Sequence, residues 1–153
     1  MSRKRCIRKQ WAKVDPIALA ISGATITSET DLDKLRLREL AALEQFAAGR
    51  AQPADFRDLC DMLNLAETMA GMGIGPEVLA ACEGAQAALL AAKEGYEQRR
   101  VMVLADAGLL ALRDLYEFHD LQRTSVDRST YERAISKTRN RIRGAHPEVT
   151  VLV

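Results

Sequence analysis

Three polar side chains, Glu39, Glu67 and His119, fall inside apolar helical stripes. Glutamate and histidine side chains on separate helices can together hold metal ions in helical bundles. The two-metal bundle pattern needs Glu-x-x-His pairs, however, and the sequence has none. Because buried polar groups are ordinarily paired, we predict that each glutamate meets an arginine such as Arg36 or Arg113, and that His119 is hydrogen-bonded or half exposed. We expect no metal and no cofactor.

The sequence lacks the common catalytic motifs and has few histidines. The sequence has no phosphate-binding loop and no GxSxG or HExxH motif, and only His119 and His146 could act as an imidazole base. Three cysteines, Cys6, Cys60 and Cys82, are far apart without a CxxC spacing, so they indicate neither a disulfide framework nor a zinc site. We therefore predict a protein that is not an enzyme and works in a reducing compartment.

Basic residues are concentrated at the two ends of the chain. Residues 1–13 carry six lysines or arginines and no acid, residues 123–143 carry seven against two acids, and residues 14–122 carry nine against 18 acids. Such asymmetry is typical of a surface for nucleic acid or an acidic partner, although basic ends can also fold back on an acidic middle. The candidate contacts of the N-terminal segment are Arg3, Lys4, Arg5, Arg8 and Lys9.

The segment RSTYERAISKTRNRIRG, residues 128–144, separates its apolar and polar residues on a helix. The apolar stripe consists of Tyr131, Ala134, Ile135, Thr138 and Ile142, and the outward side of Ser129, Arg133, Lys137, Asn140 and Arg141. These polar and basic types contact phosphates and base edges in nucleic-acid complexes. A helix and a short turn precede the segment, which is the order of a helix-turn-helix, although the turn lacks glycine. The alternative is a solvated wall of an ordinary bundle helix.

The elements that position these residues are predicted to be helices. Alanine and leucine are abundant, aromatic residues make up only 5%, and β-branched runs are few, which favours helix over sheet. Proline, cap and glycine positions predict helices over residues 16–22, 28–49, 53–71, 76–99, 106–123 and 127–144. We expect one all-α domain, a five- or six-helix bundle over residues 15–145, with a basic N-terminal arm at 1–14 and a short extended C-terminal tail at 146–153.

The fourth predicted helix carries a stripe rich in small residues, which lets another helix approach closely within the chain or across a dimer. Its members are Val78, Ala81, Cys82, Ala85, Leu89, Ala92 and Tyr96. That stripe and the apolar terminal residues EVTVLV favour a homodimer. The sequence holds no apolar stretch suited to a signal peptide or a membrane span, so we expect a cytoplasmic protein with no membrane partner.

Several long segments resemble small uncharacterised proteins encoded by phages and prophages of proteobacteria. They are RKRCIRKQWAKVDPIA, LDKLRLREL, DLCDMLNLAETMAGMGIGP and ALRDLYEFHDLQRTSVDRSTYERAISKTRNRIR. The resemblance covers nearly the whole chain but brings no functional motif and no residue roles. It implies an accessory protein that binds a host or phage macromolecule, for instance as an inhibitor of a host defence complex. We expect a protein partner slightly ahead of the alternative, a nucleic-acid-binding transcriptional regulator.

Overall fold

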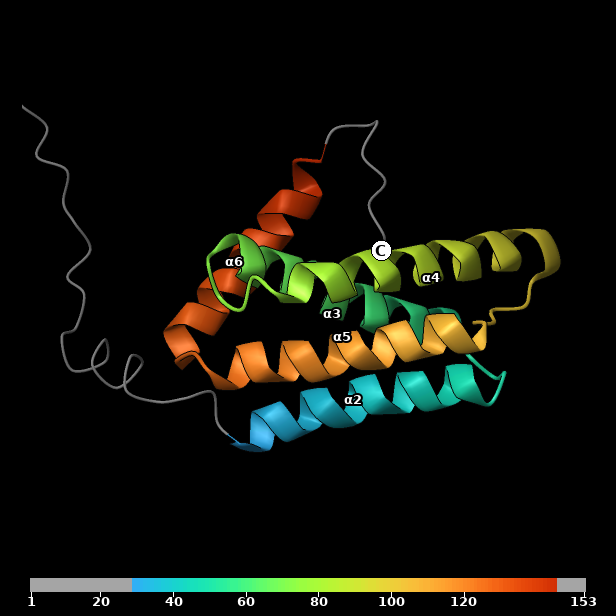
Figure 1. Cartoon of the computed structure of the whole chain (residues 1–153), viewed down its shortest axis with the longest axis horizontal. Helices are drawn as coiled ribbons and strands as arrows, with labels where there is room; N and C mark the ends of the chain where they lie inside the picture. Colours follow the sequence, from blue (N-terminus) through green and yellow to red (C-terminus); the bar gives the residue numbers. More distant parts are fainter. Residues whose placement is uncertain (1–28, 146–153) are drawn as a thin grey trace, which may run out of the picture.

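Five α-helices joined by short connections make up the part of the chain that the computed structural model describes, residues 29–145 (Figure 1). They are α2 (Glu29–Ala47), α3 (Pro53–Gly71), α4 (Val78–Arg99), α5 (Asp106–Thr124) and α6 (Arg128–Arg143). The predicted all-α bundle is confirmed. The helix expected over residues 16–22, the N-terminal arm and the C-terminal tail lie outside the described residues.

Local signals set the bounds of these helices. At the start of α6, where the sequence offers Asp127 or Ser129 as the cap, the Asp127 carboxylate accepts a hydrogen bond of 2.7 Å from the Thr130 backbone N–H. The backbone N–H of Gln52 donates to Asp55 at 2.7 Å where α3 begins, and Pro53 occupies the first turn. Asp106, which the sequence suggests as the cap of α5, is instead its first helical residue, and Ala105 is the cap.

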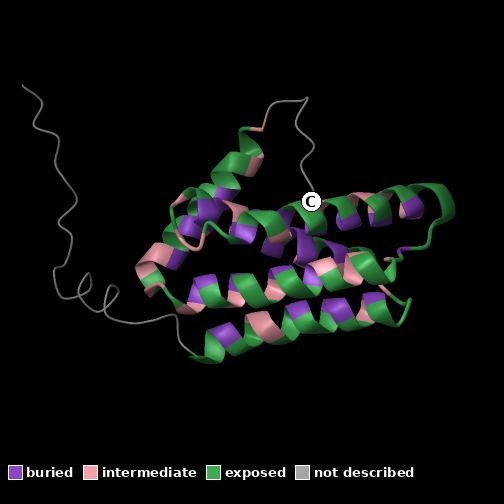
Figure 2. Cartoon of the chain, in the orientation of Figure 1, coloured by how far each residue is buried: buried purple, intermediate pink, exposed green. Residues whose placement is uncertain are grey.

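Helices α2, α3, α4 and α5 pack into a bundle in which α5 contacts each of the other three. Figure 2 shows their buried residues on the inward faces, and α3 has the most, including Leu59, Cys60 and Leu63. Helix α6 crosses one end of this bundle and packs on α3 (Figure 1). A smaller apolar cluster, separate from the main core, holds it there and is centred on Met69, Tyr131 and Ala134.

Small residues bring α4 and α5 close together. A Cβ atom at Gly84 would lie 3.4 Å from the Cβ of Ala111, and one at Gly108 would lie 3.0 Å from the Cβ of Ala88. The predicted small-residue stripe of α4 is therefore used within the chain, with Ala85 and other members fully buried against the core. This stripe gives no support to a homodimer.

Valine at Gly108 is expected to lower the free energy of unfolding by about 1–3 kcal/mol, because its branched side chain must push α4 away from α5. The control is Gly71→Ala, where a Cβ atom would meet nothing within 4 Å and stability should stay the same or rise slightly. Urea denaturation of both variants measures the difference. Equal stabilities of parent and Gly108→Val would contradict the close approach.

No helix within residues 29–145 combines the length and the apolar character that a membrane crossing requires.

Candidate functional site

The outward side of α6 carries the exposed charge expected from the sequence. We define the basic face of α6 as six of its nine exposed residues, namely Arg133, Ser136, Lys137, Arg139, Asn140 and Arg143; the other three, Arg128, Glu132 and Arg141, form ion pairs. The opposite side is buried against α3 through Tyr131, Ala134 and Thr138, with Ile135 half-buried beside them. The predicted apolar stripe is thus the packing surface of α6, and the basic face is left open to solvent.

The charges of the basic face have no ion-pair partner within the described part of the chain. Glu132 is the only acid on α6, and Arg128 pairs with it through an Nε to Oε1 contact of 2.8 Å. Arg133 instead reaches the hydroxyl of Thr130, at 3.4 Å. Burial raises the pKa of Asp61 on α3, and the charge of Arg139 works against that rise. Four cations are therefore presented together.

Arg141 differs from the other residues proposed for this face. Its Nη2 donates to the Glu67 carboxylate at 3.0 Å and to the backbone carbonyl of Asn64 at 3.1 Å. The expectation that Arg141 points away from the bundle is therefore wrong, since it ties α6 to α3. The same ion pair gives Glu67 an arginine partner, as predicted.

Arg139 and Arg143 belong to the basic face, although they are not among the residues predicted for it. Arg139 and Arg143 are four residues apart and therefore lie on one side of the helix. Ser136 and Asn140 separate them from Arg133 and Lys137. This spacing is the feature of the sequence that could have predicted their place on the face. The predicted outward side was centred too close to Arg141, so it stopped short of them. The N-terminal candidates, Arg3, Lys4, Arg5, Arg8 and Lys9, lie outside the described residues.

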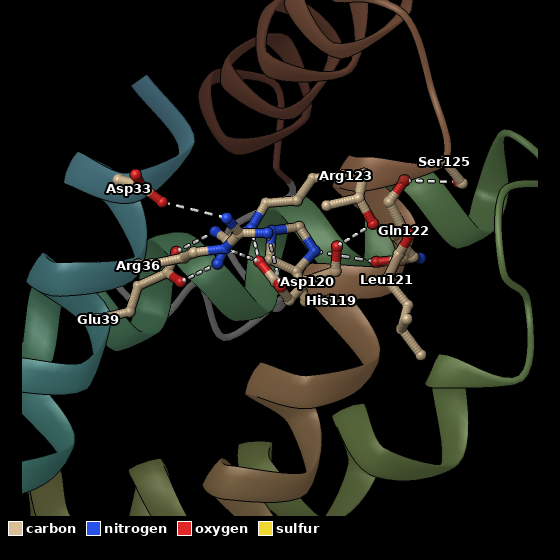
Figure 3. Close-up of polar contacts among 10 residues, drawn as sticks. Asp33, Arg36, Glu39, His119, Asp120, Leu121, Gln122, Arg123 and Ser125 are labelled. Atoms are coloured by element: carbon tan, nitrogen blue, oxygen red, sulfur yellow. Dashed lines mark hydrogen bonds and ion pairs between the residues drawn. The ribbon is translucent and has the colours of Figure 1, made fainter. Parts of the chain in front are cut away.

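A buried polar cluster joins α2 to α5 (Figure 3). The Arg123 side chain is fully buried and holds Glu39 with two contacts, from Nη1 to Oε1 at 2.9 Å and from Nη2 to Oε2 at 2.8 Å. Its Nε donates to Asp120 at 2.8 Å. Arg36 binds the same carboxylate from α2, with Nε to Oδ1 at 2.8 Å and Nη2 to Oδ2 at 3.0 Å. Glu39 thus meets an arginine as predicted, but the arginine is Arg123 and not Arg36 or Arg113.

The ionisation of this cluster follows from its burial and its pairing. Burial raises the pKa of Glu39, and the hydrogen bond and charge of Arg123 work against that rise. For Arg123, burial works to lower the pKa, but its bonds to Glu39 and Asp120 outweigh burial and raise it. The pKa of Asp120 is lowered, because the two arginines outweigh its partial burial. The two contacts between Arg123 and the Glu39 carboxylate favour the ionised form of this pair.

His119 lies beside this cluster and is fully buried. Its Nδ1 is 2.9 Å from Oε1 of Gln122, whose amide nitrogen donates to the backbone carbonyls of Ile74 at 2.8 Å and Ala66 at 3.2 Å. Because that amide nitrogen faces the carbonyls, Oε1 faces the imidazole and Nδ1 carries the proton. Burial lowers the pKa of His119 to about 4. His119 is therefore neutral and, as predicted, hydrogen-bonded.

These side chains do not form a metal site among residues 29–145, where no three His, Cys, Asp or Glu residues are grouped to hold an ion. Glu39 and Glu67 are each bound to a different arginine. His119 is bound to Gln122. The arrangement links helices and supplies no open ligand set.

A groove of about 460 Å³ lies between the α3–α4 connection and the end of α5. Glu77 is the only charged residue in its lining, and Phe118 and Leu121 supply apolar surface. The two hydroxyls there are already engaged, since Thr124 donates to the carbonyl of Asp120 at 2.9 Å and Ser125 donates to that of Gln122 at 2.7 Å. The groove therefore offers no activated nucleophile.

Comparisons with protein-family models, with curated proteins and with solved structures each gave no match.

Proposed function

We propose that this chain is a non-catalytic accessory protein that acts by binding a host or phage macromolecule through the basic face of α6. The observation that carries the proposal is the group of four exposed cations, Arg133, Lys137, Arg139 and Arg143, without an ion-pair partner in residues 29–145. Exposed charges of one sign attract a partner of the opposite sign and speed its association. The partner surface is therefore anionic.

The packing of α6 supports this role. Its buried stripe and the Arg141–Glu67 ion pair hold the helix on α3, so the basic face is available without any rearrangement of the fold. A preformed surface loses less conformational entropy on binding than one that must first be ordered. Occlusion of a partner's surface, as in an inhibitor of a host defence complex, needs no chemistry beyond such contact.

A protein partner has separate support on the outer surfaces of α2 and α5. Leu37 and Leu40 of α2 are 69% and 45% exposed, and Leu110 and Leu121 of α5 are 59% and 67% exposed. Acidic residues such as Glu117 lie on the same helices. Exposed apolar side chains within polar surroundings are typical of contacts between proteins.

The double variant Leu110→Lys, Leu121→Lys tests this surface of α5. If the variant loses a partner that the parent binds, that partner contacts α5.

The proposal predicts that reversing three charges, by Arg133→Glu, Lys137→Glu and Arg143→Glu, abolishes partner capture from a host lysate. The fold should persist, because each side chain is exposed and surface changes alter stability by no more than about 0.5 kcal/mol each. Arg141 is left in place because it binds α3. Affinity capture followed by mass spectrometry gives the readout, with circular dichroism as the test of folding.

The matched control reverses three exposed arginines elsewhere, Arg50, Arg57 and Arg113, so that net charge changes by the same amount. We expect this variant to retain the partner. Retention of the partner by the α6 variant, or equal loss from both variants, would contradict a contact surface on α6.

A further inference from the structure

The four cations of the basic face form two rows. Arg133 and Lys137 are four residues apart, as are Arg139 and Arg143, so each pair lies on one side of the helix about one turn apart. Residues six positions apart differ by about 120° around a helix, and this angle separates the two rows. Ser136 and Asn140, both exposed, lie between them.

The composition of this face suits phosphate groups better than a protein surface. Its six residues include no aromatic and no large apolar side chain, whereas the residues that dominate protein interfaces are aromatic or apolar anchors and their pockets. Arginine, lysine, serine and asparagine are the types that bind phosphate oxygens. Asparagine can in addition form two hydrogen bonds with the edge of adenine.

The dimensions of α6 fit a groove of duplex DNA. A helix with its side chains is about 10–12 Å across, and the major groove of B-form DNA is about 12 Å wide. Two rows of cations on either side of a polar strip then face the two phosphate backbones that border the groove. The major groove of an RNA duplex is too deep and narrow for side chains to read its bases, so the geometry selects DNA.

We infer that α6 binds in the major groove of duplex DNA, with the rows Arg133/Lys137 and Arg139/Arg143 on the two phosphate backbones and Asn140 on base edges. This inference rests on the proposed function, because it uses the same face of α6 and names the partner. It also agrees with the order of α5, a three-residue turn and α6, which matches that of a helix-turn-helix.

The test is fluorescence anisotropy of the full chain with a labelled random-sequence DNA duplex of about 20 base pairs, titrated between about 50 and 200 mM salt. Four phosphate contacts predict a plot of log affinity against log salt with a slope of about −3.6 or steeper. Changing all four cations to alanine should make that slope shallower by about 3 to 4, roughly one per contact. The triple variant Arg50→Ala, Arg57→Ala, Arg113→Ala should bind like the parent.

Asn140→Ala tests the orientation of α6 in the groove. Selection from a random duplex library should return a preferred sequence for the parent, and the variant should lose the preference at one position with the salt slope unchanged. A parent that selects no sequence, or a variant that keeps the full preference, overturns the base contact of Asn140.

Other results overturn the inference as a whole. They are no binding to duplex DNA at about 50 mM salt, equally tight binding to single-stranded DNA or duplex RNA, and unchanged binding by the four-alanine variant. The capture of a protein partner that depends on the α6 charges, together with no binding to DNA, would refute the DNA inference and leave the proposed function standing. The proposed function itself falls when charge reversal on α6 leaves partner capture intact, or when the control variant loses the partner equally.

Discussion

Arg123→Met is expected to lower the free energy of unfolding by about 3–5 kcal/mol, the largest stability effect we predict for a single side chain. Arg123 is fully buried and binds Glu39 and Asp120 at the same time. Removing it leaves the buried Glu39 carboxylate without its cation, and a buried charge without a partner is strongly destabilising. Urea denaturation at neutral pH measures the loss.

Two further variants separate the cost of the unpaired charge from that of lost packing. In the double variant Arg123→Met, Glu39→Leu no buried charge is left alone, and Asp120 keeps Arg36, so much of the lost stability should return. Arg128→Ala breaks an exposed ion pair and should cost no more than about 1 kcal/mol. A single Arg123→Met variant as stable as Arg128→Ala would contradict the structural role of the cluster.

Stability is expected to fall by about 3 kcal/mol as pH falls from about 6.5 towards 4, because of His119. The imidazole is buried and neutral in the folded chain, with a pKa lowered to about 4 from 6.5. Between these values the unfolded chain binds a proton that the folded chain does not, so stability is full above pH 6.5 and decreases as the pH is lowered. A tenfold difference in proton affinity corresponds to about 1.4 kcal/mol, which gives the stated magnitude.

His119→Gln isolates this contribution from that of the carboxylates. A glutamine amide can still donate to Gln122 but does not titrate. Urea denaturation between pH 4 and 7 gives the slope of the free energy of unfolding against pH for parent and variant. The two slopes should differ by the equivalent of up to one bound proton. Parallel curves would show that His119 can be protonated in the folded chain at little cost.

The helix positions were predictable because they depend on neighbours in the sequence. Pro53 sets the start of α3 and Asp127 caps α6, and both features act within one helical turn. The apolar stripe of α6 was equally accessible, since helical periodicity alone places Tyr131 and Ala134 on one side. Fold class and core faces therefore followed from local rules.

The polar cluster was not predictable by the same means. Arg123 lies at the end of α5, where a cation is ordinarily an exposed residue favoured by the helix dipole. Its burial depends on Glu39, 84 positions earlier in the chain. Arg141 likewise meets Glu67 across 74 positions. Such contacts depend on how the helices are placed, which one sequence does not specify.

The attachment of α6 has a consequence for local stability. This helix is held by the cluster around Met69, Tyr131 and Ala134, whereas the core of the other four helices is a separate group of buried residues. Helices with their own small contact area can open without global unfolding. Helix α6 is therefore a candidate cooperative unit with its own opening free energy, smaller than that of the bundle. Any partner that binds only the docked form of α6 would increase that opening energy selectively.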